Sequence, residues 1–519
     1  MNNLFDYDID DIYSIVSYAK KLKGKTFKQI VNEYNNSPYK SYTEYADFSY
    51  YVAGNSIASN QHYDLIREEN IQYNVQPYNP NYNSKGALGT IIEKCYFGYN
   101  PNSNQEADFS SAGLELKVTT VDVTKDGYRA GERLSITNIS YKQPVIEDFY
   151  SSHVWNKIRN ILLIDYVRDK TVSKDNCVIQ FVYLYNPSAE DLKIIVSDYY
   201  YIINKIKSGK AHELHEGDTN YLGSCTKGAK SETNFRNQYY GDHTPAQKRN
   251  FCFRQPYMNY ILHEYVIKDN EECDRIIDSY DVLKNDTLDQ IVLKRIRRFQ
   301  GRSDLELSTQ FNVKQEKNKN LWVTLTFRML GIKSNNAEEF KKAGIKVKTI
   351  RVEEDNTVNE HWELPPVDFM ELINEDWYES ELRNTLIDNR WLIVLFKKHG
   401  SHYYLYDATL YSFDDYVIDT GIREEWLEVQ NVIKEGVKFT IRGKRVFNNI
   451  PNPSVTNYIH MRPHANKSAY RFGNYSRGNI KNDAKMLPNG DYMTTQSFWI
   501  NEKYFSKVII QDIFHLYTE

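Results

Sequence analysis

The chain has 519 residues, and at roughly 100–200 residues per domain this length predicts two to four domains. Hydrophobic residues make up 41% of the sequence and charged residues 26%, a globular balance that excludes wholesale disorder. The 65 basic and 69 acidic residues give a net charge of −4, which excludes a uniformly basic coat for nucleic acid but leaves room for a local basic face.

The cysteines and the apolar segments indicate the compartment. The five cysteines form no CxxC pair, which argues against a disulfide scaffold and against a cysteine zinc site. Residues 1–11 are acidic without an apolar core, so no signal peptide is expected. The apolar run at residues 391–396 is far shorter than the roughly 20 residues that a membrane helix needs. We therefore expect a cytoplasmic protein without a membrane partner.

Short segments recur in the same order in the two halves of the chain. Residues 112–117 read AGLELK and residues 343–348 read AGIKVK, an offset of 231. Four further pairs follow this order and indicate an internal duplication: 22–31 with 283–292, 152–157 with 380–385, Tyr221-Leu222 with Tyr458-Ile459, and Tyr257-Met258 with Tyr492-Met493. We expect one copy over residues 1–275 and a second over residues 283–519.

Local patterns predict the elements of the first copy in chain order. Apolar residues at helical spacing, among them Ile12, Ile15, Val16 and Ala19, predict an opening helix. A Tyr- and Asn-rich insertion follows at about residues 32–85 and is expected on the surface. Residues 114–118 alternate apolar and polar side chains, as a half-buried strand does. Residues 156–167 predict a helix that runs into an apolar strand.

Two acids and a lysine of the first copy form a pattern that suits phosphodiester hydrolysis. Glu115 and Lys117 are two apart on the predicted strand, so both side chains leave the same face. Asp108 precedes the strand at a turn that can bring its carboxylate beside Glu115. Two carboxylates form a hard oxygen site that suits Mg²⁺, and a lysine ammonium can stabilise an attacking hydroxide. Without further support, an acid-x-Lys pattern is most often a solvated strand face.

The segments around this pattern resemble the MutH family of GATC-specific endonucleases. The resemblance runs through residues 89–98, 108–117, 152–157, 209–213, 221–229 and 257–258, and through 462–465 and 496–501 near the C-terminus. The doubled chain is closer to the two-copy restriction endonucleases of that family than to the single-copy repair nickase. This resemblance implies an α/β fold of two restriction-endonuclease-like (MutH-type) domains, each a mixed central sheet flanked by helices.

The resemblance also implies roles for individual residues. Asp108 and Glu115 would bind Mg²⁺, Glu93 would support the metal or its water from a helix, and Lys117 would position the nucleophile. Lys157 would be a second active-site lysine, although a solvated lysine is the alternative. DNA contacts would come from Glu132, Lys227 and Tyr257 in the first copy, and from Arg462, His464 and Tyr492 in the second. Tyr257 as a core aromatic and Glu132 as a surface acid remain open alternatives.

The second copy lacks most of the pattern. Glu339 stands at the position of Asp108 and could still bind metal, but Lys346 replaces Glu115 and Thr385 replaces Lys157. A cation in place of a carboxylate repels Mg²⁺, so the second copy is predicted to be catalytically inactive. It keeps a basic stretch, residues 462–485, with six basic residues and one acid. The stretch 205–254 of the first copy has nine basic residues and five acids, and Lys248 and Arg249 within it are expected at phosphates.

Together these features predict a Mg²⁺-dependent type II restriction endonuclease that cuts double-stranded DNA at GATC. Its C-terminal copy would bind DNA and regulate, and the protein would dimerise on DNA or bridge two sites. A cognate DNA methyltransferase is expected in the same system. Two other functions remain open: a strand-nicking repair endonuclease and a non-catalytic sequence-specific DNA-binding protein.

Overall fold

The structure is a computed structural model, and it describes residues 6–37, 77–101, 106–226, 234–268, 273–315, 319–358, 362–465 and 467–517. Most of the predicted Tyr-rich insertion therefore lies outside the described residues. The contacts divide the chain into two compact units. Unit 1 comprises residues 1–192 and 250–270, and unit 2 comprises residues 193–249 and 271–519. The fold is mixed α/β in both units, and within the described ranges no helix is long and apolar enough to cross a membrane.

Unit 1 is built on a four-stranded mixed sheet with the strand order β2-β1-β4-β5. The strands are β1 (Glu115–Thr124), β2 (Gly127–Ala130), β4 (Ile161–Val167) and β5 (Ile179–Tyr185). β1 runs parallel to β4, with Glu115 opposite Ile161, and both β2 and β5 are antiparallel to their neighbours. β4 is almost fully buried, as expected for an inner strand covered on both faces. A separate pair, β3 (Leu134–Asn138) with β9 (Arg249–Phe253), is antiparallel.

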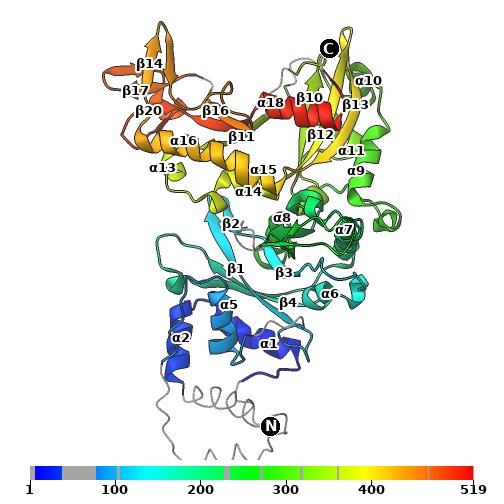
Figure 1. Cartoon of the computed structure of the whole chain (residues 1–519), viewed down its shortest axis with the longest axis vertical. Helices are drawn as coiled ribbons and strands as arrows, with labels where there is room; N and C mark the ends of the chain where they lie inside the picture. The colour runs from blue at the N-terminus through cyan, green and yellow to red at the C-terminus, as the bar shows by residue number, and fades with distance from the viewer. Residues whose placement is uncertain are drawn as a thin grey trace, which may run out of the picture. The chain divides into compact units, whose positions relative to one another are not determined.

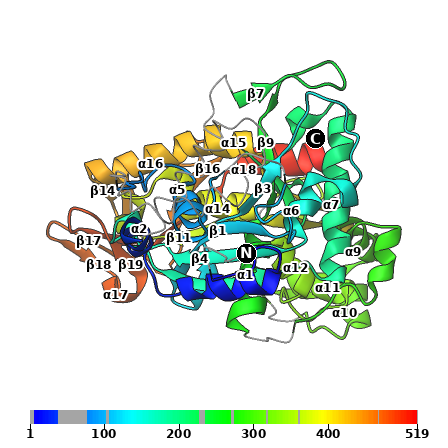
Figure 2. The same ribbon diagram turned by 90° about the horizontal axis from the view of Figure 1, so that it is seen from below.

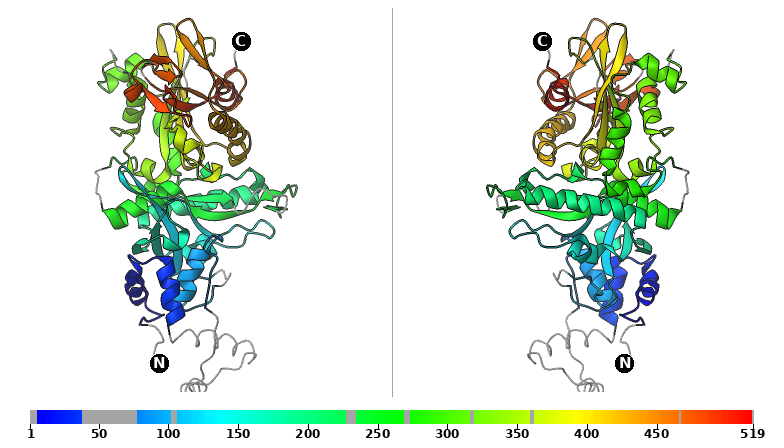
Figure 3. Two further views of the ribbon diagram at one scale, coloured as in Figure 1. Left: turned by 90° about the vertical axis from the view of Figure 1, so that its left-hand side faces the viewer. Right: turned by 90° about the vertical axis from the view of Figure 1, so that its right-hand side faces the viewer.

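Helices from the N-terminal part of the chain form a core with this sheet. Ile15, Val16 and Ala19 of α1 (Ile12–Ala19) are buried, so the predicted opening helix is confirmed. Thr26 caps α2 (Phe27–Asn36) in a capping box, which fixes where that helix begins. Figure 3 shows α1 and α2 in dark blue and α5 (Ala87–Ile91) in lighter blue at one end of the unit. The remaining helical segments of unit 1 are η1 (Lys20–Leu22), η2 (Ile92–Tyr96), η3 (Phe149–Ser151), α6 (His153–Ile158), η4 (Lys174–Asn176), α8 (Gln255–Leu262) and η8 (His263–Ile267). α7 (Ala189–Lys207) begins in unit 1 and ends in unit 2.

Unit 2 repeats the central motif with a three-stranded sheet in the order β10-β12-β13 (Figure 1). β10 (Ile345–Val352) runs parallel to β12 (Arg390–His399), which pairs antiparallel with β13 (His402–Tyr411). Three further groups of strands follow. They are β11 (Trp362–Val367), β21 (Gln496–Ile500) and β16 (Ile459–Pro463); β14 (Phe439–Arg442) and β15 (Arg445–Asn448); and β18 (Tyr475–Arg477), β17 (Tyr470–Phe472), β20 (Tyr492–Thr494) and β19 (Ala484–Met486).

The other elements of unit 2 surround these sheets. Its short strands are β6 (Leu222–Thr226), β7 (Phe235–Arg236) and β8 (Ala246–Gln247). Its helices are α9 (Leu288–Arg297), α10 (Asp304–Gln310), α11 (Leu321–Leu330), α12 (Glu338–Ala343), α13 (Phe369–Leu372), α14 (Glu381–Asp388), α15 (Asp415–Val417), α16 (Arg423–Glu435), α17 (Ile480–Asp483) and α18 (Glu502–Phe505). Its 3-10 and π-helical turns are η5 (Ala211–Glu213), η6 (Glu216–Asp218), η9 (Tyr280–Lys284), η10 (Trp377–Glu379), η11 (Ile418–Ile422) and η12 (Ser506–Ile513).

The two halves of the chain share local geometry at matching positions. Gly113 precedes β1 with φ +64° and Gly344 precedes β10 with φ +65°, a conformation that favours glycine. Thr287 caps α9 in a capping box as Thr26 caps α2. The order of two parallel strands followed by an antiparallel one is also the same in both central sheets.

A carboxylate holds the start of one strand in each half. Asp198 of α7 accepts hydrogen bonds from the backbone amides of Asn220, Tyr221 and Leu222, at 3.1, 2.7 and 3.0 Å. Glu425 of α16 accepts from three consecutive amides at residues 457–459, at 2.6, 3.0 and 2.8 Å. This match supports the pairing of Tyr221-Leu222 with Tyr458-Ile459, because β6 and β16 begin at Leu222 and Ile459.

One of the sequence pairings is wrong. Tyr257 lies in helix α8, whereas Tyr492 lies in strand β20, so the two do not occupy equivalent places. β9 is followed by α8 and β21 by α18, which makes Tyr504 the counterpart of Tyr257. The hydroxyls of Tyr257 and Tyr185 are 2.7 Å apart, and those of Tyr504 and Tyr411 are 2.9 Å apart. Tyr185 and Tyr411 end β5 and β13, the edge strands that pair antiparallel with the inner strands β4 and β12, so the two pairs correspond.

Candidate active site

Two lysines converge on one buried carboxylate at the start of β1 in unit 1. Glu115 is 1% exposed, and the Lys157 ammonium donates to both of its oxygens at 2.9 and 3.0 Å. The Lys117 ammonium lies 2.6 Å from one of the same oxygens. Residues 42 apart in sequence are brought together because α6 ends directly before β4, which pairs in parallel with β1. The predicted same-face arrangement of Glu115 and Lys117 is confirmed, but the burial of Glu115 departs from the expected half-exposed alternation.

Asp108 reaches the same strand from the preceding turn. Its carboxylate accepts the backbone N–H of Leu116 at 2.9 Å. The turn is closed by hydrogen bonds between Phe109 and Leu114 and passes through Gly113. Gly113 has φ +64°, a left-handed conformation that favours glycine at this turn. The turn therefore fixes Asp108 beside Glu115, as the sequence predicted.

Glu93 adds a third acid from the π-helical turn η2. Burial, together with the negative charges of Asp108 and Glu115, raises its pKa to about 7, against the opposing effect of Lys117. Burial and the charge of Glu115 also raise the pKa of Asp108, although the hydrogen bond from Leu116 opposes this shift. Clustered acids with raised pKa values are typical of functional sites. Placing carboxylates close together destabilises the folded protein, so such clusters are usually kept for a function.

Helix α6 holds Lys157 in place. Ser152 caps the helix by accepting the N–H of Trp155, and the Ser152 hydroxyl donates to Phe149, which anchors the cap in the core. Lys157 itself is only 8% exposed, so the alternative of a solvated lysine is wrong. Its charge is neutralised by Glu115.

The acids of this centre have the chemistry of a magnesium site. Within the described residues, no three His, Cys, Asp or Glu side chains are close enough together to hold a metal ion. Asp108 and Glu115 nevertheless supply hard oxygen donors, and burial, with the charge of neighbouring carboxylates, raises the pKa values of Glu93 and Asp108. The oxygen donors of Asp108 and Glu115 are of the kind that Mg²⁺ prefers, and these two side chains would hold the ion with Glu93 nearby.

The expected DNA-contact residues of unit 1 lie in different surroundings. Glu132 is exposed, and its carboxylate is 3.4 Å from the hydroxyl of Thr119, which follows Glu115 and Lys117 on the same face of β1. Tyr257 is fully buried, with its hydroxyl bonded to Tyr185 and, at 3.0 Å, to Asp191. This burial favours the core alternative for Tyr257.

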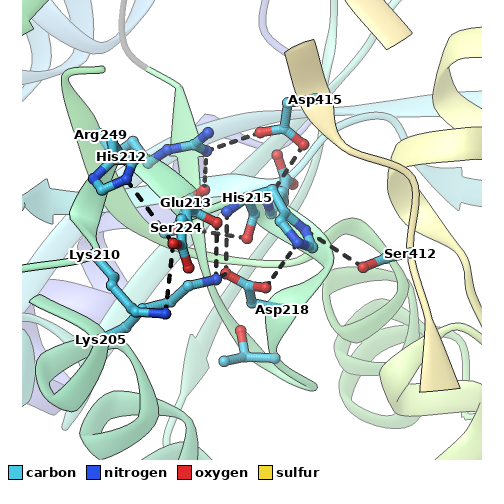
Figure 4. A network of polar contacts seen from close by, with 12 residues as sticks. Lys205, Lys210, His212, Glu213, His215, Asp218, Ser224, Arg249, Ser412 and Asp415 are labelled. Atoms are coloured by element: carbon cyan, nitrogen blue, oxygen red, sulfur yellow. Dashed lines mark hydrogen bonds and ion pairs between the residues drawn. The ribbon is translucent and has the colours of Figure 1, made fainter. Parts of the chain in front are cut away.

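In unit 2, a buried ion-pair network holds the strand that precedes Lys227. Lys227 itself lies outside the described residues. Arg249 is 4% exposed and donates to the carboxylate of Asp415 and to the carbonyl of Ser224 in β6, both at 2.8 Å (Figure 4). His215 pairs with Asp218 at 2.9 Å and lies 3.4 Å from the hydroxyl of Ser412. The predicted phosphate contact of Arg249 is therefore wrong, because its charge is buried and paired.

The remaining DNA candidates of unit 2 lie on strands. Arg462 of β16 is partly exposed, with its guanidinium 5.1 Å from the ring of Trp499. His464 follows the same strand, and its Nδ1 contacts the carboxylate of Glu363. Tyr492 of β20 is partly exposed, with the guanidinium of Arg471 4.2 Å from its ring. These side chains are accessible enough to touch a ligand.

In unit 2, the residues at the positions that match Asp108 and Glu115 in the sequence contact other parts of the chain. Glu339, at the position of Asp108, is fully buried, and its two oxygens accept the backbone amides of Ile276 and Ile277 at 3.0 and 2.8 Å. The ammonium of Lys346, at the position of Glu115, lies over the ring of Trp391. Glu339 is therefore a structural ligand of the segment that joins the copies, and the expectation that it could still bind metal is wrong. Sequence reasoning missed this role because no local pattern marks a backbone-binding glutamate.

Comparisons with known proteins give the same assignment as the geometry. The family model described as the DNA mismatch repair enzyme MutH matches residues 97–198, a range that includes Asp108, Glu115, Lys117 and Lys157. The type II restriction enzyme Sau3AI of Staphylococcus aureus is 32% identical over 456 residues, which cover 82% of this chain and 92% of that enzyme. The chain belongs to the MutH-like restriction endonuclease family. The DNA mismatch repair protein MutH of Histophilus somni (strain 2336) is 26% identical over 184 residues, which cover 35% of this chain and 80% of that protein.

The two relatives differ in the share of the present chain that they match. The MutH protein matches about a third of the chain, whereas Sau3AI matches most of it. The greater coverage places this chain with the restriction endonucleases of the family.

Proposed function

We propose that this restriction endonuclease hydrolyses both strands of double-stranded DNA at GATC with Mg²⁺, using Glu93, Asp108, Glu115, Lys117 and Lys157. The observation that carries the proposal is the convergence of Lys117 and Lys157 on the buried Glu115 carboxylate, next to Asp108. GATC specificity follows from the family resemblance. As a DNA-cutting enzyme of this kind, it would act in the cytoplasm, beside a DNA methyltransferase that protects the host's own sites.

The residues divide the chemistry between them. Asp108 and Glu115 would hold Mg²⁺, which when bound supplies charge neutralisation at the scissile phosphate. The Lys117 ammonium is placed to orient the attacking water and to stabilise the hydroxide as its proton leaves. Lys157 fixes the orientation of Glu115 through two hydrogen bonds and offsets its buried charge.

We propose further that the chain contains two MutH-like copies, residues 1–275 and 283–519, and that only the first is catalytic. The matched tyrosine pairs and the matched carboxylate clamps of Asp198 and Glu425 support the duplication. The second copy would contact DNA through Arg462, His464 and Tyr492 and regulate the first. With one catalytic centre per chain, cutting both strands of a palindrome requires two chains or two successive nicks.

Sequence reading in the first copy is assigned to Lys227 and, beside the catalytic strand, to Glu132. Lys227 follows β6 in the sequence, and Arg249 and Asp198 hold that strand in place. A well-held strand is a suitable support for a residue that reads the edge of a nucleobase. A lysine that reads a base edge discriminates by about 1–3 kcal/mol at one base pair.

Plasmid cleavage tests the function directly. Purified protein with Mg²⁺ should convert a plasmid that contains unmethylated GATC sites to linear fragments, and a plasmid without GATC should stay intact. Methylated GATC plasmids in parallel would report the effect of methylation. Nicked circles without linear product would indicate a nickase, and sequence-specific binding without any cleavage would indicate a DNA-binding protein that lacks catalysis.

A further inference from the structure

A hairpin in unit 2 carries positive charge at a tip that the fold leaves uncovered. Strands β14 and β15 are joined by a two-residue turn at Gly443 and Lys444, with Gly443 at φ +59° and Arg442 opposite Arg445. Arg442, Lys444 and Arg445 are all exposed. In Figure 1 the hairpin, in orange, stands at the edge of the unit beside β17.

The hairpin has its aromatic packing at its base. Phe439 stacks on Phe472 of β17 with ring centroids 4.4 Å apart, while Ile441 and Phe447 nearer the tip are 46% and 44% exposed. An isolated two-stranded hairpin is marginally stable in water, and exposed apolar side chains on it are a cost. The guanidinium of Arg442 lies 5.4 Å from the ring of Phe447, which partly covers that ring. Such an arm is typical of an element that becomes buried against a partner.

The charge around the arm has one sign. Residues 436–482 include nine basic residues and no acid. The neighbouring hairpin of β17 and β18 adds Arg471 and Arg477, and the guanidinium of Arg477 donates to the carbonyl of Lys444. Across the described ranges, no carboxylate pairs with Arg442, Lys444 or Arg445. Like charges held together without counter-charges favour a polyanionic partner.

We propose that the β14–β15 hairpin lies in the major groove of a DNA duplex and contacts phosphates on both sides through Arg442, Lys444 and Arg445. The major groove is about 12 Å wide and admits a two-stranded ribbon, whose strands are about 4.8 Å apart. Lysine and arginine contacts to phosphate are independent of sequence. This inference rests on the proposed function and places a DNA contact of the second copy outside Arg462, His464 and Tyr492. Through these contacts the second copy would bind DNA without requiring a GATC site.

The test compares salt dependence between two matched triple variants of the full-length chain. The hairpin variant is R442Q/K444Q/R445Q, and the control is K284Q/K294Q/R298Q, which removes the same charge from exposed positions elsewhere in unit 2. Both carry Asp108→Ala to prevent cleavage. Affinity for a 30-base-pair duplex without GATC is measured by fluorescence anisotropy at several salt concentrations.

Each phosphate contact contributes about 0.9 to the slope of log affinity against log salt. The hairpin variant should therefore lose about three from the slope, and the control should keep the parent slope. Arg445→Lys keeps the charge and should keep the slope, whereas Arg445→Gln should lose about one. Equal slopes for both triple variants, or stronger competition by a duplex RNA than by the DNA, would overturn the hairpin assignment. The proposed function fails separately, if the unmodified protein does not cut GATC plasmids.

Discussion

The hydroxyl groups of Tyr411 and Tyr504 lie 2.9 Å apart in unit 2, in the place where Tyr185 and Tyr257 lie 2.7 Å apart in unit 1. In each case a tyrosine at the end of an antiparallel edge strand, β5 or β13, meets a tyrosine on the helix that follows β9 or β21. Since unit 2 has this pair although Lys346 stands at the position of Glu115, we attribute the pair to the fold and not to the chemistry. Tyr257 is then a residue of the core.

Replacing Tyr257 with Phe tests this role. The change removes hydrogen bonds to Tyr185 and Asp191 and leaves buried polar groups without a partner, so the free energy of unfolding should fall by about 1–3 kcal/mol. Affinity for GATC duplexes should be unchanged. Tyr504→Phe is the matched control and should destabilise unit 2 to a similar degree. Chemical denaturation and anisotropy measure the two effects, and a loss of affinity without a loss of stability would return Tyr257 to the DNA surface.

Asp108→Ala and Lys157→Met should separate two roles in the catalytic centre. Asp108→Ala should abolish cleavage while leaving DNA affinity largely intact, because metal ligands and groove contacts use different residues. Lys157→Met should reduce the cleavage rate by about 100-fold or more and also lower stability by on the order of 3 kcal/mol, since it leaves Glu115 buried with one partner fewer. The double variant Lys157→Met/Glu115→Gln should recover stability but not activity. Recovery of cleavage in the double variant would contradict the assignment.

Glu339→Ala should behave in the opposite way. Cleavage of a plasmid with one GATC site should remain close to that of the parent, because we assign Glu339 no part in the reaction. Its carboxylate accepts hydrogen bonds from backbone amides. Stability should fall by about 1–3 kcal/mol for each buried amide left without an acceptor, those of Ile276 and Ile277. Glu339→Gln keeps one acceptor oxygen and should fall between the two. If Glu339→Ala loses cleavage as completely as Asp108→Ala, the second copy takes part in catalysis.

The ionisation of Asp198 should contribute to the pH dependence of the free energy of unfolding. Burial raises the pKa of this carboxyl to about 6, despite hydrogen bonds from three backbone amides that favour the charged form. Between about pH 4 and 6 the folded state holds the proton more tightly than the unfolded state, whose pKa is about 3.9. Stability therefore decreases as pH rises through this window, by at most about 1.4 kcal/mol per pH unit. Asp198→Asn should remove this decrease in denaturation measured at pH 4, 5 and 6.

Asp218 should show the opposite sign at lower pH. Burial alone would raise its pKa, but the hydrogen bond and charge of His215, with the charge of Lys205, lower it to about 2. The folded state then binds fewer protons than the unfolded state, so this stabilisation is present above about pH 4 and is lost as pH falls toward 2. Asp218→Asn should flatten the acid limb of the stability curve. The same slope below pH 4 in both proteins would contradict the shift.

The sequence predicted the part of the site that is local or carried by the family pattern. Glu115 and Lys117 are two residues apart on one strand, so strand geometry alone placed them on one face. Asp108 required only the turn at Gly113. Lys157 came from the family resemblance, because no local rule brings a helix residue to a carboxylate 42 positions away. The opening helix and the helix-to-strand segment at residues 156–167 were also predictable from periodicity, although the helix begins at His153.

The errors came from contacts that a single sequence does not encode locally. Tyr492 was paired with Tyr257 because a Tyr-Met dipeptide recurs, yet one lies in a strand and the other in a helix. Arg249 read as a surface cation, because its partner Asp415 is 166 residues away. The same distance in sequence hides the hydrogen bonds of Glu339. Each case required the fold before the partner could be named.

The hydrogen bonds that Glu339 accepts from Ile276 and Ile277 have a consequence for how the chain could evolve, if it was duplicated as we propose. Once a former site acid holds the connecting segment, substituting Lys346 with Glu and Thr385 with Lys restores the missing side chains but not an open centre. The acid would first have to release the two backbone amides of Ile276 and Ile277. Under the proposed duplication, an active centre lost in the second copy would be difficult to restore, and later substitutions at its other positions would carry no catalytic penalty.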